Sequence, residues 1–417
     1  MKINSIKGMN DILPDVSNKW LYLENILQQW LRSYAYSNIR TPILEDTNLF
    51  IKSIGEVTDI VEKEMYTFID RLNGDSLTLR PEGTAGTLRA VIEHNLLYNN
   101  TQKLWYIGPM FRHERPQKGR YRQFHQLGVE AIGFNSVDVD AEIILMQQDL
   151  WDRLGITNIC LEINCLGSGQ ERGKYREILI KYFEQNMDIL DDDAKRRLYS
   201  NPLRILDTKN VKMFELVANA PCLLDCLSDI SLKHYNDWKN RLDALNIKYK
   251  ENKNLVRGLD YYNLSVFEWV TNSLGGNNLT VSAGGRYDPL ITSFHGQDNY
   301  AIGFAIGMER LILLMEEQGL LDVEQNIDFS ILTLGSVSNY AFNIAKILRN
   351  RGFSVAQNFQ NNSLKSQLKK AVSCGSRYAI ILGENEVTNN LLIVKNLIKQ
   401  EQYEFNREQF NDFICKL

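Results

Sequence analysis

The segment that most constrains the fold of this chain is a pair of strand-like runs joined by a basic loop. The runs are Leu104–Ile107 and Gln126–Ile132, and five Lys or Arg residues occupy the eleven positions from Arg112 to Arg122 between them. We therefore expect two antiparallel strands with a long, mobile connection. Arg112, placed on the rigid strand, would bind a phosphate bidentately, whereas the loop would follow a larger nucleic acid. Taken alone, such a loop is more often a solvated surface hairpin, and the motifs described next reverse that judgement.

Six short motifs connect this hairpin to a known group of enzymes. Phe111-Arg112-His113-Glu114 and Gly303–Arg310 resemble the second and third signature motifs of class II aminoacyl-tRNA synthetases. Four further segments are similar, in the same order along the chain, to motifs of the histidyl-tRNA synthetase family: Gly8–Pro14, Leu79–Thr84, Arg257–Tyr262 and Ala283–Asp288. The resemblance runs from about residue 7 to the C-terminus and is weakest between about residues 167 and 254.

Length and composition are those of a multidomain globular protein. At 417 residues and 48.2 kDa, two or three domains are expected. Charged residues at 24% and hydrophobic residues at 44% are ordinary values for this class. No run of about eighteen apolar residues occurs, and Met1–Asn4 lacks an apolar signal core, so we expect a cytoplasmic protein without a membrane segment.

Charge is distributed unevenly along the chain. From Ile327 onward there are 11 Lys or Arg against 7 Asp or Glu, although the whole chain has a net charge of −4. A basic C-terminal unit on an acidic body would provide phosphate contacts in addition to the loop. A charge difference of this size is also common between domains, so alone it does not establish that the C-terminal unit binds nucleic acid.

The N-terminal part predicts an α+β catalytic domain over residues 1–325. Apolar spacing indicates a helix from Ser17 to about Tyr36, and Pro42 interrupts a strand at Ile39–Glu45. Strand-rich stretches then follow one another with short turns, which favours an antiparallel sheet with covering helices over a βαβ repeat. In the class II family the Ile39–Glu45 segment is the first signature motif and builds a homodimer interface, so the resemblance implies a homodimer.

Two further regions follow this sheet. Residues 167–250 are polar and favour helices, and we expect them to form a helical insertion. Strands are expected at Tyr261–Val270 and Thr280–Ala283, joined by a turn at Gly275–Asn278. Residues 327–417 alternate strands with helices, the pattern of a three-layer α/β domain with a mostly parallel sheet. This unit resembles the anticodon-binding domain of class II synthetases.

The resemblance implies a two-step reaction. The carboxylate of L-histidine attacks the α-phosphate of ATP to give histidyl-adenylate and pyrophosphate, and histidine then passes to the 3′ end of tRNA(His). Such an enzyme works by positioning and fixed positive charge. By this likeness Arg112 and Arg257 are the catalytic residues that face the α-phosphate, with Arg112 also binding the histidine carboxylate, and Arg310 binds the far phosphates. Mg²⁺ should accompany ATP, and its protein ligands are not identified.

The same resemblance assigns the remaining nucleotide contacts. Glu114 would contact adenine, Arg120 the γ-phosphate, and Phe124 would stack on adenine together with Arg310. For tRNA the loop residues are Arg115, Gln117, Lys118 and Arg122, with Gln117 the candidate for the extra 5′ guanosine of tRNA(His).

Selection of histidine requires acceptors for the imidazole N–H groups. Gln126 and Glu130 lie four apart on the second strand and share a face, with Gly128 between them expected to leave room for a ligand. The family pattern adds Tyr262, with Tyr261 and Tyr287 as further candidates. It also implies that the turn containing Glu82, Gly83 and Thr84 binds the α-amino group.

Two alternatives come from related proteins. The first is a catalytically silent relative, the synthetase-like regulatory subunit of ATP phosphoribosyltransferase, which typically lacks the C-terminal domain and has eroded motifs. The second is another class II synthetase such as the threonyl or prolyl enzyme, which would lack the Arg257–Tyr262 motif. This chain keeps Arg112, Arg257 and Arg310 and has the domain, which favours the enzyme. Pro289 departs from the family pattern, which usually has Gly there.

Overall fold

The computed structural model describes residues 3–55, 58–208, 210–274, 279–294, 296–321, 327–359 and 363–417. Contacts divide the chain into two compact units, Met1–Leu321 and Asp322–Leu417. The predicted domain boundary near residue 326 and the expected turn at residues 275–278 lie outside the described residues.

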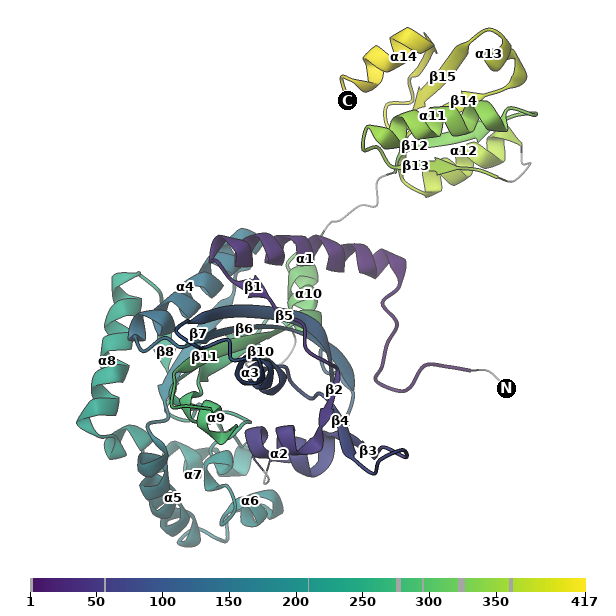
Figure 1. Cartoon of the computed structure of the whole chain (residues 1–417). Helices are drawn as coiled ribbons and strands as arrows, with labels where there is room; N and C mark the ends of the chain where they lie inside the picture. The colour runs from purple at the N-terminus through teal and green to yellow at the C-terminus, as the bar shows by residue number, and fades with distance from the viewer. Residues whose placement is uncertain are drawn as a thin grey trace. The chain divides into compact units, whose positions relative to one another are not determined.

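The first unit is built on a sheet of eight strands, in the order β1-β5-β6-β11-β10-β9-β7-β8 (Figure 1). Neighbouring strands are antiparallel except for the two edge pairs, β1 with β5 and β7 with β8. The predicted antiparallel sheet of an α+β domain is therefore confirmed. Its strands are β1 Ser37–Asn38, β5 Gln102–Phe111, β6 Gln123–Ile132, β7 Ile159–Cys165, β8 Tyr249–Glu251, β9 Asn263–Thr271, β10 Leu279–Arg286 and β11 Ala301–Gly307.

The predicted basic hairpin is the pair β5 and β6, with Phe111 opposite Gln123 at the loop end. Arg112 was expected on the strand but follows its last residue. Its backbone N–H still donates to the carbonyl of Arg122 at 2.9 Å, so the two segments of the hairpin remain paired one residue beyond the ends of β5 and β6. The base of the loop is thereby as well fixed as a strand position.

Helices cover one face of this sheet. On β6 the side chains of Leu127, Val129 and Ala131 are fully buried on that face, and the alternate residues point to the other face. Helix α10 contacts β6, α4 contacts β11 and α8 contacts β9. The covering helices are α1 Pro14–Ser33, α4 Val137–Leu154, α8 Asp229–Ala244 and α10 Met308–Glu317.

Helix α1 begins three residues earlier than expected. Pro14 occupies its first turn, where a fixed φ suits the helix and the missing N–H is not needed. A cap at Ser17 is therefore unnecessary. Trp30 on this helix is fully buried and its indole N–H donates to the carbonyl of Met146 at 2.8 Å, which joins α1 to α4.

A smaller sheet, in the order β2-β4-β3, accompanies the main one. The expected single strand at Ile39–Glu45 is wrong, because Pro42 lies between β1 and β2 and these strands belong to different sheets. A proline donates no ladder hydrogen bond, so the chain changes sheets there. The elements of this region are β2 Leu44–Asp46, α2 Thr47–Ile54, a π-helical turn Ile60–Glu64, β3 Tyr66–Ile69, β4 Ser76–Leu79, α3 Thr84–Glu93 and α9 Asp288–Ser293.

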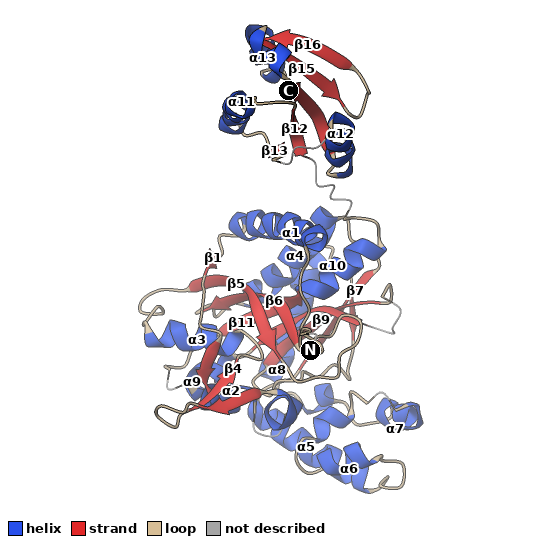
Figure 2. Cartoon of the chain, turned by 90° about the vertical axis from the view of Figure 1, so that its right-hand side faces the viewer, coloured by secondary structure: helices blue, strands red, loops and turns tan. Residues whose placement is uncertain are grey.

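The predicted helical insertion is present but shorter than the expected residues 167–250, because α8 and β8 fall within that range and belong to the main sheet and its covering layer. Its helices lie together, apart from α1, α4 and α10 (Figure 2). Helix α5 begins with a capping box in which Ser168 and Glu171 satisfy each other's backbone N–H groups. The insertion comprises α5 Gly169–Glu184, α6 Asp192–Arg197, α7 Phe214–Ala218 and short 3-10 turns at Pro202–Ile205, Val211–Met213 and Leu223–Cys226.

The second unit has a sheet in the order β13-β12-β14-β15-β16 between two helical layers. Phe329 and Ile344 belong to a core shared with α11 and α14, whereas Leu332 and Ala371 belong to a core shared with α12. The three-layer prediction is thus confirmed. Its elements are β12 Ile327–Thr333, α11 Ser338–Asn350, β13 Val355–Gln357, α12 Leu364–Ser373, β14 Ser376–Leu382, α13 Glu384–Thr388, β15 Leu391–Asn396, β16 Gln402–Asn406 and α14 Arg407–Ile414.

The expected mostly parallel sheet is only half correct. Strands β13, β12 and β14 are parallel, but β15 and β16 pair antiparallel to their neighbours. The connections from Leu382 to Leu391 and from Asn396 to Gln402 are too short for a parallel crossover, which needs about a dozen residues or more.

Candidate active site

A cavity of about 560 Å³ lies on the face of the main sheet opposite its covering helices. Strands β5, β6, β10 and β11 form its floor, and the motif loops form its walls. It collects all the residues predicted for histidine and ATP except Gly83: Glu82, Thr84, Arg112, Glu114, Arg120, Phe124, Gln126, Glu130, Arg257, Tyr261, Tyr262, Tyr287 and Arg310.

The deepest polar group in this cavity is the carboxylate of Glu130 on β6. It is fully buried and accepts hydrogen bonds from the hydroxyls of Thr84 at 2.8 Å, Tyr287 at 2.5 Å and Tyr106 at 3.3 Å. Burial raises the pKa of Glu130 to about 8, although the Tyr287 hydroxyl acts in the opposite direction. Three hydroxyl groups converge on this one carboxyl group and hold it in place at the cavity.

The space expected beside Gly128 is filled by protein rather than left for a ligand. Tyr106 stands opposite Gly128 on β5, and a Cβ on Gly128 would lie 2.0 Å from the ring. A Cβ on Gly83 would lie 2.2 Å from the same ring. Gly83 therefore serves the site by making room for Tyr106, which brings its hydroxyl to Glu130.

A third glycine makes room for the carboxylate itself. A Cβ on Gly303 of β11 would lie 1.9 Å from Oε2 of Glu130. Gly303 pairs directly with Glu130 across the ladder, so the absence of a side chain is what admits the carboxylate. The sequence marked Gly303 only as part of a motif, and Tyr106 was missed because an aromatic residue in a strand is usually core.

Each carboxylate oxygen of Glu82 accepts a hydrogen bond from a backbone N–H group. Glu82 accepts the backbone N–H groups of Thr84 at 2.6 Å and Ala85 at 2.8 Å, which satisfies the first turn of α3 where the cap residue is Gly83. Burial raises the pKa of this carboxyl, and the backbone bonds oppose the shift. Glu82 therefore fixes the turn that carries Thr84 as well as lining the cavity.

The predicted catalytic arginines approach from two sides. Arg257 forms an ion pair with Glu268 on β9 and lies over the ring of Tyr262, 5.5 Å from its centroid. Its Nε is buried and has no protein acceptor among the described residues. Burial lowers the pKa of Arg257, but Glu268 and the neighbouring tyrosines outweigh it and the net shift is upward.

Arg112 and Arg310 enclose the nucleotide end of the cavity. Nε of Arg112 donates to the carbonyl of Pro81 at 2.9 Å, and its guanidinium lies over the ring of Phe124 at 5.3 Å. Arg310 donates to the carbonyls of Gly119 at 3.0 Å and Thr280 at 2.7 Å. Burial lowers the pKa of Arg310 and the nearby Arg120 adds to this effect. A group of cations close enough to repel each other is suited to an anionic ligand.

The loop of the hairpin divides into exposed and fixed residues. Arg115, Gln117 and Lys118 are exposed. Arg122, expected to contact tRNA, is partly buried: its Nε donates to the carbonyl of Glu114 at 3.2 Å, and its backbone N–H donates to the carbonyl of Gly8 at 2.7 Å. It therefore fastens the N-terminal motif to the base of the loop.

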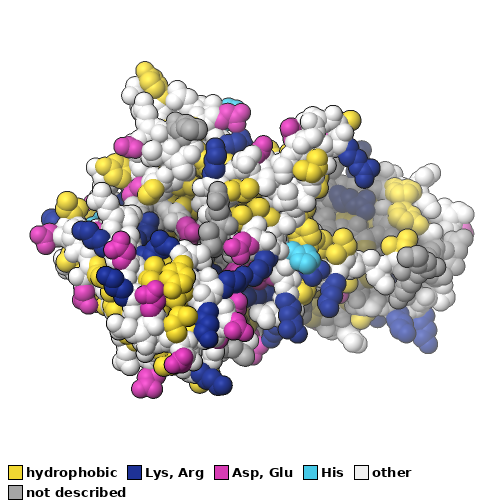
Figure 3. Space-filling view, turned by 90° about the horizontal axis from the view of Figure 1, so that it is seen from below, with side chains coloured by type: hydrophobic (Ala, Val, Ile, Leu, Met, Phe, Trp, Pro, Cys, Tyr) yellow, Lys and Arg dark blue, Asp and Glu magenta, His cyan; other side chains and the backbone are white. Residues whose placement is uncertain are grey.

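Charge on the surface of the molecule is mixed. On the face seen in Figure 3, Lys and Arg side chains alternate with Asp and Glu, so phosphate binding there depends on local arrangement rather than on net charge. The described residues contain no group of three His, Cys, Asp or Glu side chains placed to bind a metal ion. Nor does any helix within them have the length and apolarity to cross a membrane.

The Ala283–Asp288 motif serves both the site and the fold. Tyr287 faces the cavity, whereas Arg286 is buried and pairs with Asp140 of α4 at 2.6 Å and with Asp288 at 3.3 Å. The ion pair with Asp140 joins the end of β10 to α4 and fixes the residue next to Tyr287.

Comparison with known proteins gives the family. A family model described as histidyl-tRNA synthetase matches residues 8–168 and 209–311, and an anticodon binding domain model matches residues 328–417. A histidine–tRNA ligase of Laribacter hongkongensis is 59% identical over 398 residues, covering 95% of this chain and 94% of that protein. A Burkholderia pseudomallei histidine–tRNA ligase is 54% identical over 401 residues, covering 95% and 90%.

A solved structure extends the likeness to three dimensions. The apo histidyl-tRNA synthetase of S. aureus is 38% identical, with a TM-score of 0.83 and 99% of each chain covered. Sequence and fold agree along nearly the whole length. The chain belongs to the histidyl-tRNA synthetase family.

Proposed function

We propose that this chain joins L-histidine to tRNA(His) at the expense of ATP, by way of histidyl-adenylate. The observation that carries the proposal is a single cavity with the buried Glu130 carboxylate and its hydroxyl donors at one end and the cations Arg112, Arg257 and Arg310 around the rest. A carboxylate suits an imidazole, and fixed guanidinium groups suit an adenylate and its phosphates.

In this proposal the histidine imidazole lies against Glu130 and Gln126. The Oε1 of Gln126 is buried with no protein donor among the described residues, so an imidazole N–H would satisfy it. Tyr262, Tyr261 and Tyr287 enclose the ring. A site that hydrogen-bonds a polar group of its substrate rejects analogues lacking it by roughly 10⁴-fold or more.

Activation then depends on position and charge. The free Nε of Arg257 and the guanidinium of Arg112 would face the α-phosphate from opposite sides as the histidine carboxylate attacks it, with pyrophosphate leaving toward Arg310 and Arg120. Adenine would lie at Phe124 and Glu114. Mg²⁺ bound to ATP would neutralise phosphate charge, held largely by phosphate oxygens and water.

Transfer requires tRNA, for which two regions are suited. The exposed Arg115, Gln117 and Lys118 of the loop would contact the acceptor end. On the C-terminal unit Phe342 and Phe359 are 48% and 77% exposed, and their rings stack 6.1 Å apart. Exposed aromatic rings are a platform for unpaired RNA bases, so we assign the anticodon to this unit.

Homodimer formation is part of the proposal. Ile43, Leu44, Phe68 and Ile69 lie exposed around the small sheet β2-β4-β3. Apolar side chains gathered in this way favour burial against a partner. The expected state is two chains per particle, measured by light scattering at micromolar concentration.

The regulatory-subunit alternative is not favoured. The chain carries the full set of arginines and an anticodon binding domain match, and the 59% identical relative is a histidine–tRNA ligase. The deciding test is charging of tRNA(His) with labelled histidine by the purified chain. A chain that binds histidine but yields no charged tRNA with active ATP and tRNA present would contradict the proposal. We place this activity in the cytoplasm, where charged tRNA is used.

A further inference from the structure

The segment Arg257–Tyr262 is a thin wall between two cavities. One is the 560 Å³ cavity already described, and the other, of about 300 Å³, lies between this segment and the insertion. Arg257, Leu259 and Tyr262 line both. On the side that faces the second cavity this wall therefore lacks close packing, although Tyr261 and Tyr262 are buried and belong to the apolar core.

Polar bonds from other segments fasten the wall instead. Nη1 of Arg172 donates to the backbone carbonyl of Tyr262 at 2.5 Å, and Nδ2 of Asn201 donates to Oδ1 of Asp260 at 3.1 Å. The backbone N–H of Asp260 donates to the carbonyl of Ile54 at 3.1 Å. Arg172 and Asn201 both belong to the insertion, so the insertion determines where the wall stands.

Arg172 is the stronger of these two ties. It is partly buried, and burial lowers its pKa while Asp260 opposes that shift. The two acceptors found for its guanidinium among the described residues are the carbonyls of Tyr262 and, at 3.4 Å, Gly167. A charged donor in a partly desolvated position forms stronger bonds than a neutral one.

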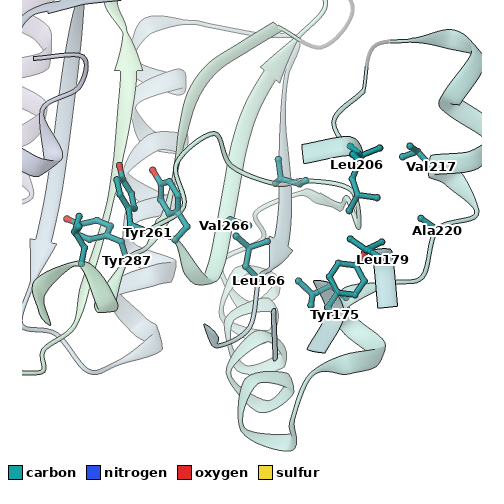
Figure 4. Close-up of a cluster of buried hydrophobic side chains, with 14 of the residues drawn as sticks. Leu166, Tyr175, Leu179, Leu206, Val217, Ala220, Tyr261, Val266 and Tyr287 are labelled. Carbon is teal, nitrogen blue, oxygen red and sulfur yellow. The ribbon is translucent and has the colours of Figure 1, made fainter. Parts of the chain in front are cut away.

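The apolar core connects the same two regions. A single cluster extends from Tyr175 and Leu179 of α5, through Leu166, to Tyr261 and Tyr287 at the histidine site (Figure 4). Helix α5 therefore carries Arg172 on a body that is rigidly joined to the site. A shift of the Tyr262 carbonyl would also move the Tyr262 ring. That ring packs against the ring of Tyr261, and the guanidinium of Arg257 lies over its face.

We propose that Arg172 is a positioning residue for histidine: by binding the Tyr262 carbonyl it sets the place of the tyrosine and arginine that face the substrate. The inference rests on the proposed function and adds to it a residue of the insertion that touches no substrate. Its effect on KM should fall on histidine rather than on ATP, because Arg112, Phe124 and Arg310 lie on the β5–β6 hairpin and α10, outside this wall. Arg257 is the one proposed phosphate contact on the wall, so a displaced Arg257 should lower kcat.

The test compares Arg172→Met with Arg176→Met. Arg176 lies one helical turn further along α5, lines the same second cavity, and donates to the carbonyl of Tyr199 instead of the wall. In histidine-dependent ATP–pyrophosphate exchange, Arg172→Met should raise KM for histidine about tenfold or more, the scale of a lost charge-assisted hydrogen bond, and leave KM for ATP nearly unchanged. Arg176→Met should leave both near the starting values. Arg172→Lys should recover part of the loss, since an ammonium can still reach one carbonyl.

Histidine binding measured by calorimetry, without ATP, provides a readout independent of chemistry. It should weaken in Arg172→Met and not in Arg176→Met. Equal effects of the two substitutions, or equal changes in KM for histidine and ATP, would overturn the inference. If Arg172→Met does not fold, Arg172→Lys and Asn201→Ala test the inference in its place. The inference is overturned if neither variant shows a selective rise in KM for histidine. Failure of the unsubstituted chain to bind histidine would instead contradict the proposed function.

Discussion

Replacing Glu130 with Gln should change how the free energy of unfolding depends on pH. Burial raises the pKa of this carboxyl from 4.5 to about 8, with the Tyr287 hydroxyl opposing the shift. Between these values the folded protein keeps a proton that the unfolded chain has released. The free energy of unfolding should therefore fall as pH rises through this window, and the contribution should be complete below about pH 4.5 and lost above about pH 8.

The size of the effect follows from the shift. A difference of about 3.5 pH units at about 1.4 kcal/mol per unit is worth at most about 5 kcal/mol. Gln has the same shape and no charge, and its amide can exchange hydrogen bonds with the hydroxyls of Thr84, Tyr106 and Tyr287 because each hydroxyl both donates and accepts. The variant should therefore fold and lack this pH dependence.

The assay is urea unfolding of the parent and Glu130→Gln from pH 5 to pH 9. Groups remote from the site titrate alike in both proteins, so the difference in free energy of unfolding reports Glu130 together with its coupling to Glu82. We expect the variant to gain on the parent by several kcal/mol as pH rises. A difference that stays constant with pH would refute the reasoning, because it would mean that the buried carboxyl is charged throughout.

Four further outcomes follow from the site. Gly303→Ala places a methyl group 1.9 Å from the buried carboxylate and should lower the free energy of unfolding by more than about 2 kcal/mol. The control Gly173→Ala, whose methyl group meets no atom within 4 Å, should not lower it. Equal urea midpoints for the two variants would contradict this. Arg257→Ala should keep the fold and lower exchange by about 10², and near-normal exchange would remove its catalytic role. Phe359→Ala should raise KM for tRNA about fivefold or more without altering exchange, with Phe359→Trp restoring it; an unchanged KM would rule out the platform. A chain ending at Asn326 should lose most charging yet keep exchange, and full charging by it would refute the anticodon assignment.

Much of the fold was predictable because its signals are local. The hairpin β5–β6 follows from strand-like runs on either side of a Pro- and Gly-containing loop, and the insertion follows from a polar, helix-favouring stretch. The antiparallel strands β15 and β16 were not predicted, because alternation of strands and helices does not report the direction of a strand that returns after a short connection.

The site shows a similar division. Motifs brought nearly all the predicted residues into one cavity, since the strands β5, β6, β10 and β11 and the loops and helix starts next to them carry those motifs. The sequence did not predict which side chains pack against each other in the site. The ring of Tyr106 fills the space at Gly128, and Gly303 leaves room for the carboxylate of Glu130. Those contacts join β5, β6 and β11 across the ladder and depend on register, which no single segment encodes.

The most direct test of the account is exchange of labelled pyrophosphate into ATP by the purified full-length chain, with histidine compared against other amino acids and against no amino acid. The cavity of Glu130, Gln126 and the three arginines predicts exchange that requires histidine and is lost when Arg257 is replaced by Ala. Exchange that is absent with histidine, or that is equally rapid with another amino acid, would contradict the central claim.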